Sequence, residues 1–530
     1  MWRLVLIALA AVTVPLAQQK TGSISGVVRD ASTDAVLSGV HISADGHQAV
    51  TDSLGRFSIG DVAAGSQWVH AWASERGGSG GVYVAVSAGE QAAAEIRLKL
   101  GGSITGRVVD EDHRPVTGAS VILLSRRYEN GRLAYSPVKS APTDKDGVYR
   151  LDAVYSETPY LLLVKKALKA NPASEDERES VLAPSYYPNV RDVGAAQTVT
   201  LMPGEVRTGV DIRVNPAPGY CIAGAVDRVG AAQDLAVSIT ENLALGSGWS
   251  LSPATVKVGV EGRFAACGLH PGEYRLSASG EPPASANAIV TDRDLADLKL
   301  LGRPVPTIAG EVAFDPPPRE KPGVIDLSLM TYTNFGGPGY VDSLEKGASF
   351  GLGGALSFGD QVQVPGAFDL GRVAPGEWQV RLGKLPAGCY LKAATYGAQD
   401  VRHAPLRPAE SAGGERLRLV LGCDGGAVSA KVTDDNGNPV SHVVLYLVPA
   451  GVASEGELSV NMRRANVVNG WSAPLSDVPP GKYLALATEL DVDTSADKVE
   501  KLWQARGSGQ ELTVAAAAMV QIELRPVEIE

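Results

Sequence analysis

Basic charge and long apolar runs are both scarce in this sequence, and each scarcity excludes a class of protein. The 530 residues include 48 Lys and Arg against 59 Asp and Glu, a net charge of −11 that is spread along the chain without a basic stripe. Nucleic-acid binding needs clustered Lys and Arg to neutralise phosphates, so we exclude that class. No stretch reaches the roughly 20 apolar residues that cross a bilayer, so we expect no membrane span in the mature chain.

Residues that usually perform catalysis are also few. The seven His are scattered, and the single His-x-x-Glu, from His270 to Glu273, straddles a Pro-Gly turn without a third zinc ligand. There is no Gly-x-Ser-x-Gly motif, and the glycines of 351–354 lack the Lys of a phosphate loop. We therefore predict that the chain is not an enzyme and that it has no catalytic metal and no cofactor.

Acidic residues gather only in short turns. Asp434 and Asp435 lie in one such turn, and Glu489, Asp491 and Asp493 lie in another. Oxygen-rich loops can bind calcium, but neither turn has the spacing of an EF-hand. We interpret them as solvated turns, and whether any loop binds calcium stays open.

The N-terminus has the pattern of a secretory signal. Arg3 provides a positive charge, residues 4–14 form an apolar run, and Ala17 is a small residue before the polar Gln18. We expect residues 1–17 to be a signal peptide. The sequence then predicts an exported protein, periplasmic or extracellular.

Turn-forming residues are abundant, and they recur in a fixed pattern with aromatic residues. A Gly-containing turn precedes one aromatic residue, and a second aromatic follows 10 to 12 residues later. The five pairs are Phe57 and Trp68, Tyr149 and Tyr160, Phe264 and Tyr274, Phe368 and Trp378, and Trp471 and Tyr483. Three of the second members directly follow a Pro-Gly turn. Such a period indicates a row of similar modules, and we expect the paired aromatics to pack in their cores.

Each expected module opens with an alternating strand, Ile or Val followed two positions later by Gly or Ala. The five openings lie at 24–28, 104–108, 222–226, 308–312 and 428–432. Alternation of this kind is typical of a half-buried strand. Helical patterns are scarce: only 496–505 and, more weakly, 292–301 are candidates. The sequence predicts an all-β chain with very little helix.

Together these motifs resemble the carboxypeptidase regulatory-like domain family. The resemblance rests on the opening Ile-x-Gly-x-Val, the Asp-rich turn, the Gly-x-aromatic and the Pro-Gly-x-aromatic, and it extends over nearly all of the mature chain. It implies a tandem array of about five small transthyretin-like β-sandwich modules, as in multi-repeat exported bacterial proteins, without the catalytic domain of carboxypeptidases. The expected modules span 18–100, 101–216, 217–305, 306–421 and 422–530.

The four cysteines form an even set, which favours disulfides in an exported chain. Three connectivities are possible, and buried free thiols are the alternative. Proximity along the chain favours Cys221 with Cys267 and Cys389 with Cys423.

Three aromatic residues outside the expected cores are candidates for ligand contact. Trp72 shares a strand face with Trp68 and His70, and Tyr186 and Tyr187 lie in a loop flanked by proline. Packing is the competing interpretation, in the core for Trp68 and within the loop for the two tyrosines, and we prefer it. Our leading hypothesis is a non-enzymatic binding or scaffold protein of the bacterial envelope, with a protein or polysaccharide partner. The alternative is a carbohydrate-binding protein that uses exposed aromatics.

Overall fold

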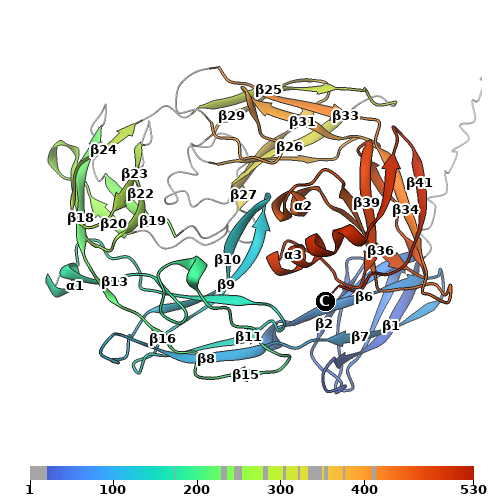
Figure 1. Ribbon diagram of the computed structural model, residues 1–530, viewed down its shortest axis with the longest axis horizontal. Helices are drawn as coiled ribbons and strands as arrows, with labels where there is room; N and C mark the ends of the chain where they lie inside the picture. The colour runs from blue at the N-terminus through green and yellow to red at the C-terminus, as the bar shows by residue number, and fades with distance from the viewer. Residues whose placement is uncertain are drawn as a thin grey trace, which may run out of the picture. The chain divides into compact units, whose positions relative to one another are not determined.

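The computed structural model describes residues 21–172, 175–227, 235–243, 254–278, 284–302, 306–319, 323–331, 349–350, 356–373, 377–408 and 414–529. The expected signal peptide lies outside these ranges. The described chain is a succession of small β-structures, each with its own hydrophobic core (Figure 1). Two compact units contain them, residues 1–101 and residues 102–530. The predicted all-β tandem fold is confirmed, whereas the exact module boundaries stay a prediction.

The first unit holds one sandwich of two sheets. Its inward-facing residues, among them Ile24, Val28, Phe57 and Ile96, form a single core. One sheet has the order β4 (Arg56–Ala63), β1 (Thr21–Asp30), β7 (Gln91–Leu98), and the other β3 (His47–Val50), β2 (His41–Ala44), β5 (Gly65–Ala73), β6 (Gly78–Val86).

The second module repeats this plan at the start of the second unit. One sheet contains β11 (Val148–Val154), β8 (Gly102–Val109), β15 (Val206–Arg207) and β16 (Ile212–Arg213), and the other β10 (Arg132–Pro142), β9 (Ser120–Glu129), β12 (Tyr160–Lys165) and β14 (Ser185–Tyr186). A short excursion adds α1 (Glu175–Glu179) and the pair β13 (Ser180–Leu182) and β17 (Pro216–Pro218).

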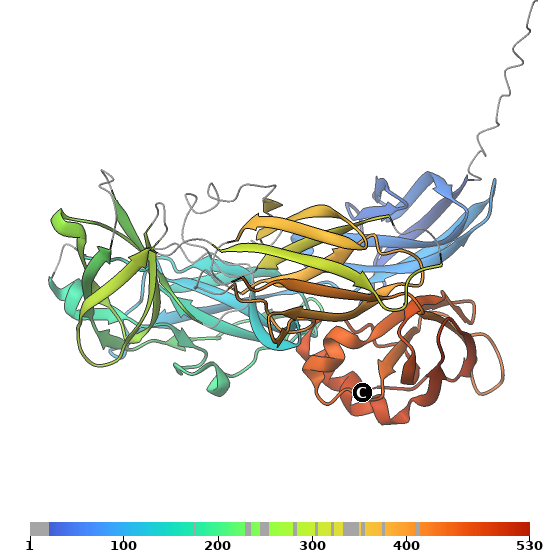
Figure 2. The same cartoon turned by 90° about the horizontal axis from the view of Figure 1, so that it is seen from above.

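The third and fourth modules arrange their strands differently. The third has one continuous sheet around its core, in the order β20 (Ala254–Lys257), β19 (Ala236–Glu241), β22 (Gly272–Ala278), β23 (Ala284–Val290), β24 (Leu295–Gly302), β18 (Tyr220–Asp227), β21 (Arg263–Leu269). The fourth is again two sheets, and strands of the first lie side by side in Figure 2. They are β29 (Gly366–Arg372), β25 (Thr307–Phe314), β33 (Leu417–Gly422), β31 (Tyr390–Tyr396), β32 (Gln399–Asp400), and β27 (Ser349–Phe350), β28 (Leu356–Gln363), β26 (Val324–Thr331), β30 (Gln379–Gly383).

The fifth module carries two helices on a sheet. Its strands follow the order β38 (Leu475–Val478), β34 (Gly426–Val432), β37 (Trp471–Ser472), β36 (Arg463–Val468), β35 (Val444–Pro449), β39 (Gly481–Thr488), β40 (Gln510–Val514), with β41 (Met519–Leu524) beside β34. The helices are α2 (Glu455–Asn461) and α3 (Ala496–Ala505). They bury Leu458, Val499 and Leu502 in a second apolar layer against β35.

All five modules share one pairing rule around the opening strand. It runs parallel to the module's last strand and antiparallel to the strand that carries the first aromatic residue. In four modules a glycine of the opening strand lies directly opposite that aromatic: Gly26 and Phe57, Gly106 and Tyr149, Gly224 and Phe264, Gly310 and Phe368.

The glycine is required because two groups occupy the space of its missing side chain. A Cβ on Gly310 would lie 2.0 Å from the carbonyl oxygen of Leu417 on the parallel strand and 2.4 Å from the ring of Phe368. On Gly26 the same distances are 2.0 Å to Ala94 and 2.8 Å to the ring of Phe57. The recurring glycine therefore sets how closely the opening strand, its parallel partner and the first aromatic ring pack.

The paired aromatics are core residues in three modules, as predicted. Tyr149, Tyr160, Phe264, Tyr274, Phe368 and Trp378 are all buried. The prediction was wrong for Trp68, which is 41 % exposed. The sequence has three steps from Gly65 to Trp68, whereas it has two from Gly272 to Tyr274. One extra residue in a strand reverses the direction of every side chain that follows, so β5 buries Val69 and Ala71 and exposes Trp68.

Trp471, the first aromatic of the fifth module, was also wrongly assigned to the core and is 49 % exposed. It pairs with Lys431, one residue beyond Ala430, which stands in place of the usual glycine. Ser472 lies opposite Ala430 instead and accepts a hydrogen bond from its backbone N–H at 2.8 Å. The alanine leaves less space than a glycine, and the one-residue shift places the indole on the outer face.

Two further expectations have opposite outcomes. The predicted helix at Ala496–Ala505 is confirmed as α3, with Val499 and Leu502 on its buried side. The weaker helix candidate at 292–301 was wrong, because this segment contains β24, which runs parallel to the opening strand β18. Pairing with the distant strand β18 therefore outweighed the weak helical pattern of the segment's own residues.

Both favoured disulfides are present. Cys221 is bonded to Cys267 and Cys389 to Cys423. The first joins β18 to its neighbour β21, and the second joins the residue before β31 to the residue after β33. Among the described residues, none of the helices has the length and apolar character needed to cross a membrane.

We predict that Gly26→Ala destabilises the first module by about 1–3 kcal/mol, the usual cost of overpacking a core. Gly60→Ala on β4 is the matched control, since open space surrounds the position of its Cβ. Calorimetry of the full-length chain should show one transition moved to lower temperature in Gly26→Ala only. Equal shifts in the two variants would contradict the packing account.

We also predict that Cys389→Ala with Cys423→Ala lowers the free energy of unfolding of the fourth module by about 3–4 kcal/mol. The bond closes a separation of 34 residues, and the chain-entropy relation gives this magnitude for such a loop. Guanidinium unfolding followed by the fluorescence of Trp378, the buried indole of that core, would measure the loss. An unchanged midpoint would show that the bond does not constrain the unfolded chain.

Candidate functional site

The outer face of β5 in the first module carries a group of rings, some exposed and some half-buried. Because alternate residues of a strand point to opposite faces, Val69, Ala71 and Ala73 enter the core while the residues between them point outward. The outward residues are Trp68, His70 and Trp72. Neighbouring strands add Tyr83 opposite Trp68 and His41 opposite Trp72. We call these five residues the aromatic face.

The rings of the aromatic face form two contact groups. Trp72 stacks with His41 at 5.4 Å between ring centroids and with His70 at 5.2 Å, at interplanar angles of 15° and 21°. Trp68 lies 4.7 Å from Tyr83 in a tilted arrangement. Aromatic pairs at these separations stabilise one another, so the rings hold fixed positions. Trp72 is flanked by imidazoles, whereas the indole of Trp68 is the more exposed.

A glycine-rich strand makes room for the indole of Trp68. Gly81 of β6 lies opposite His70, and a Cβ there would lie 2.5 Å from Cζ2 of Trp68. The indole therefore lies across the backbone of β6. Any larger residue at this position would displace it.

The face presents rings and hydroxyls, and it lacks a catalytic arrangement. Nε2 of His70 lies 3.0 Å from Oγ of Ser79. Burial lowers the pKa of His70 below its ordinary value, so the ring is neutral at neutral pH. Ring faces of this kind stack on other planar or apolar surfaces, and hydroxyl and imidazole groups beside them supply hydrogen bonds. The groups of the aromatic face are therefore suited to binding a ligand by stacking and hydrogen bonding.

The other two predicted contact residues lie elsewhere and are not exposed. Tyr186 belongs to the short strand β14, where the sequence predicted a loop, and it is only 5 % exposed, in agreement with the packing interpretation. It packs among Leu124, Leu161 and Leu163 on the outer side of the second module's sheet. Burial and the charge of Glu241 raise the pKa of Tyr186 to about 12. Because its ring is enclosed, Tyr186 has no face left for a ligand.

Tyr187 is partly buried against the core of the second module. Its backbone N–H donates to the carbonyl of Leu162 and its carbonyl accepts from Gln197. The backbone of Tyr187 is thus hydrogen-bonded to backbone groups of the second module. Of the three candidates, the structure leaves only Trp72 on an exposed sheet face.

The carboxylates of the Asp-rich turns bind backbone groups. Asp434 accepts from the side-chain amide of Asn438 at 3.0 Å and from the backbone N–H of Asn438 at 2.8 Å and of Asn436 at 2.9 Å. These hydrogen bonds, that of the Asn438 side chain first, lower the pKa of Asp434. Asp144 makes the equivalent pair of bonds to Asp146 and Val148. The turns thus use their carboxylates to fix their own backbone, as their interpretation as structural turns predicts.

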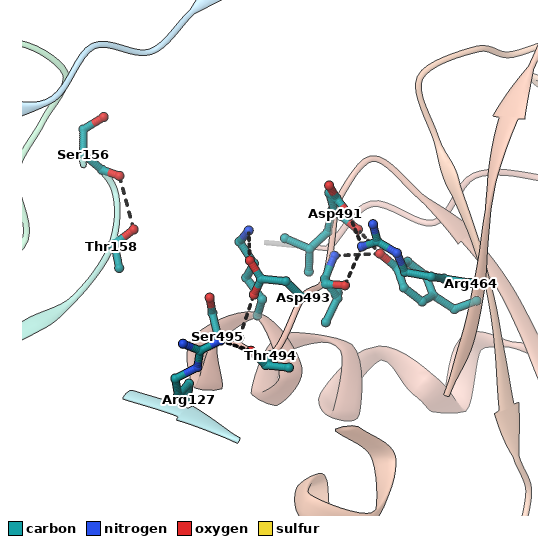
Figure 3. A network of polar contacts seen from close by, with 12 residues as sticks. Arg127, Ser156, Thr158, Arg464, Asp491, Asp493, Thr494 and Ser495 are labelled. Atoms are coloured by element: carbon teal, nitrogen blue, oxygen red, sulfur yellow. Dashed lines mark hydrogen bonds and ion pairs between the residues drawn. The ribbon is translucent and has the colours of Figure 1, made fainter. Parts of the chain in front are cut away.

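The second acidic segment connects two modules of the second unit (Figure 3). Asp491 pairs with Arg464, and Asp493 accepts from the N–H of Ser495 at 2.6 Å. Thr494, which follows Asp493, accepts two hydrogen bonds from β9. Its hydroxyl accepts one from the side chain of Arg127, and its carbonyl accepts one from the N–H of Tyr128. The acidic residues therefore fix the loop within the fifth module, and Thr494 joins that loop to the second module. Within the described part of the chain, no three His, Cys, Asp or Glu side chains gather as metal ligands.

His270, from the rejected zinc pair, is buried and faces Glu241 and not Glu273. Glu273 accepts from the side chain of Asn242 at 3.0 Å. The Pro-Gly turn between them therefore separates the two residues of the motif, and the contact of His270 with a Glu from another strand could not be read from local spacing.

Sequence reasoning placed Trp68 on the strand face of Trp72 but preferred a core position for it, which was wrong. Two signals bear on it: the extra residue before it, and the run of glycines at 77, 78, 80 and 81 in the following strand. A glycine-rich strand beside an aromatic strand is typical of a ring that lies across backbone. Both signals are local and visible in the sequence.

Comparison with solved structures finds β-rich pilins at low similarity. A streptococcal ancillary pilin matches 54 % of this chain and 99 % of its own length at 12 % identity, with a TM-score of 0.20. The shaft pilin SpaA from Lactobacillus rhamnosus GG matches 37 % of this chain and 98 % of its own at 11 % identity, with a TM-score of 0.21. The major pilin subunit BcpA of Bacillus cereus gives 10 % identity over 53 % of this chain and 100 % of its own, with a TM-score of 0.14. At these scores the likeness carries no conclusion about function.

Comparison with curated protein sequences gives no significant match. A family model does match the first module, over residues 23–99. These residues include the opening strand, the Gly26–Phe57 contact and the aromatic face. The family resemblance is confirmed for this segment, since residues 23–99 match the model of the carboxypeptidase regulatory-like domain.

Proposed function

We propose that this chain is a non-enzymatic, exported binding or scaffold protein of the bacterial envelope. Its modules are small β-structures whose large apolar residues are committed to separate cores. The carboxylates of its acidic turns fix backbone. Such rigid modules in series offer surfaces and loops for recognition.

The aromatic face carries the proposal. A monomer gains nothing in its own core from two indoles and a phenol on an outer sheet face, and exposed aromatic groups are typical of recognition surfaces. Trp68 is 41 % exposed although the corresponding residues Tyr160, Tyr274 and Trp378 are buried. The first module therefore differs from its neighbours at the position where a partner can be bound.

Export is supported by the two disulfides, since such bonds persist in oxidising compartments. The partner is a protein or a polysaccharide of the envelope. Whether the chain stays in the periplasm or leaves the cell is decided by fractionation of the native organism.

Carbohydrate is the alternative ligand, and the geometry of the rings favours it over other small molecules. The outward residues of β5 follow one another at about 6.6 Å, twice the rise of a strand, so the rings form a row along the strand. Sugar rings have apolar faces that stack on aromatic side chains, and Ser79 and His70 stand beside the row as hydrogen-bonding groups. Under this alternative, Trp72 and Trp68, about 13 Å apart along the strand, contact two separate sugar rings of one polysaccharide chain.

We predict that Trp68→Ala weakens binding of the envelope ligand about thirtyfold, because loss of a central aromatic contact costs about 2 kcal/mol. The matched control is Trp471→Ala, which removes an indole of similar exposure, 49 %, from the fifth module. A glycan array of bacterial and plant polysaccharides tests the carbohydrate alternative, and affinity capture from the native envelope tests a protein partner.

The two assays separate the hypotheses. Array signal that Trp68→Ala abolishes and Trp471→Ala retains supports carbohydrate. A blank array combined with one captured protein, lost in the same variant, supports a protein partner. Capture and array profiles that are unchanged in Trp68→Ala would contradict the aromatic face as the binding site.

A further inference from the structure

A hairpin of the second module extends beyond the sheet to which it belongs. The strands β9 and β10 pair with each other up to Glu129 and Arg132, where the turn begins. The pairing of β9 with its other neighbour, β12, covers residues 120–125. The distal part of the hairpin, residues 126–135, therefore projects past the edge of that pairing, and we call it the hairpin tip.

The turn of the hairpin tip has a fixed shape. Asn130 and Gly131 connect the two strands with φ angles of 51° and 79°. Positive φ at both central residues is typical of a type I′ turn, whose twist matches that of the flanking strands, and Asn-Gly is a preferred pair for it. The hairpin tip is therefore a preformed projection and needs no partner to define its shape.

The hairpin tip is seated on the helical side of the fifth module. The side chain of Tyr128 is 9 % exposed and belongs to the apolar cluster that contains Leu458 of α2 and Val499 and Leu502 of α3. An aromatic side chain buried in this way supplies much of the stabilisation of a small contact. We call the surface that surrounds Tyr128 the socket.

Polar contacts fix the position of the hairpin tip in the socket. The N–H of Tyr128 donates to the carbonyl of Thr494 at 2.7 Å, and Arg127 forms an antiparallel bridge with Ser495 (Figure 3). The guanidinium of Arg126 lies 2.8 Å from the carboxylate of Glu500 on α3. The tip is thus held both by its backbone and by its side chains.

The socket also fits the turn itself. Gly456 of α2 is buried, and a Cβ there would lie 2.0 Å from the carbonyl oxygen of Gly131. The fourth module contributes as well, since Arg381 donates to Oδ1 of Asn130 at 3.0 Å. The socket is therefore specific for a hairpin that ends in this turn, and every copy of the chain carries such a hairpin.

Tip and socket are far apart in the sequence, and they belong to separate cores. Arg126 and Glu500 are 374 residues apart. The core of the second module does not include Tyr128, so the tip can leave the socket without unfolding its own module. The ion pair of Arg126 with Glu500 is 30 % and 32 % exposed, and pairs of such exposure contribute little to stability. One buried ring and a few backbone contacts hold the tip in place.

We propose that the hairpin tip is an exchangeable docking element, and that its second partner is the socket of another copy of this chain. Within one chain the tip closes on its own socket, whereas entry into the socket of a second copy makes the same contacts and becomes more frequent as the protein concentration rises. Exchange of an identical element is a low-cost route to association. Tip and socket are different surfaces, so two copies can exchange tips reciprocally or several copies can join in a row. The inference goes beyond ligand binding by the first module and does not depend on it.

Sedimentation of the full-length chain tests the exchange. Between about 1 µM and 1 mM, a range that reaches the effective concentration of tethered partners, we expect dimers or longer species to increase with concentration. The control is one chain with both Arg127→Cys and Ser495→Cys. Antiparallel partners lie about 4.5–5.5 Å apart at Cα, within the range of a disulfide, so oxidation should close the tip on its own socket. This closed chain should contain roughly tenfold less associated protein at equal concentration.

A mixture of two single variants identifies the contact. With Arg127→Cys in one preparation and Ser495→Cys in the other, a disulfide between the two positions forms only between copies. The matched control replaces the first variant by Lys145→Cys, whose position lies in another turn of the second module and whose native side chain is 87 % exposed. After mild oxidation we expect the bond between positions 127 and 495 to be roughly tenfold more abundant than the bond in the control mixture. Peptide mapping without reduction measures both bonds.

Each result supports or overturns the exchange. An unmodified chain that stays monomeric over the whole concentration range would overturn it, whether or not the variants fold. Equal association of the closed chain and the unmodified chain would overturn it too, as would a bond between positions 127 and 495 that is no more abundant than that of the control mixture. Trp68→Ala should associate like the unmodified chain. Loss of association in Trp68→Ala would assign the contact to the aromatic face and contradict the role of the hairpin tip.

Discussion

The close contact between the opening strand of a module and its parallel last strand is the constraint on which this fold depends. In four modules a glycine creates it, because a Cβ there would lie about 2 Å from a neighbouring carbonyl oxygen. At Gly26, Gly106 and Gly310 the Cβ would also lie within 3.1 Å of the first aromatic ring. The ring then fills the core beneath the strand, and the final strand completes the sheet. Repetition of this one contact explains why a chain of modest apolar content can build several separate cores, each of which buries enough surface to be stable.

Departures from the repeat place residues on the surface. An extra residue before Trp68 reverses which side chains of β5 point outward, so Trp68 is exposed. In the fifth module Ala430 replaces the glycine and the strand pairing is shifted by one residue, so Trp471 is exposed as well. The first departure also aligns His70 and Trp72 on the same outer face, where a glycine-rich strand lets the indole of Trp68 lie flat. A small change in spacing can thus convert a core position into a recognition surface without loss of the module. The two indoles differ in their surroundings: Trp68 belongs to a group of rings, whereas Trp471 pairs across the sheet with Lys431.

The sequence was sufficient for properties set by local pattern. Alternation and turn residues predicted the strands around Ile24 and Ile104, proximity predicted both disulfides, and periodicity predicted α3. Properties that depend on contacts between distant residues were not predictable. The 292–301 segment became a strand because β18 offered a parallel partner, and Tyr186 was buried by strands that pair far along the chain. The contact of Glu241 with His270 and Lys165 involves three segments and two modules, so no local sequence motif predicts it. Trp68 is an intermediate case. The extra residue between Gly65 and Trp68 is visible in the sequence, but the outward direction of the side chain that follows from it was not predicted.

The central claim is that the aromatic face of the first module meets a partner in the envelope. Hydroxyl-radical footprinting tests it most directly, because it reports the exposure of individual indoles in the purified chain and in intact envelopes. We expect Trp68 and Trp72 to react in the purified protein and to be protected in the envelope, while Trp471 reacts equally in both. Equal reactivity of Trp68 in the two preparations would contradict the claim.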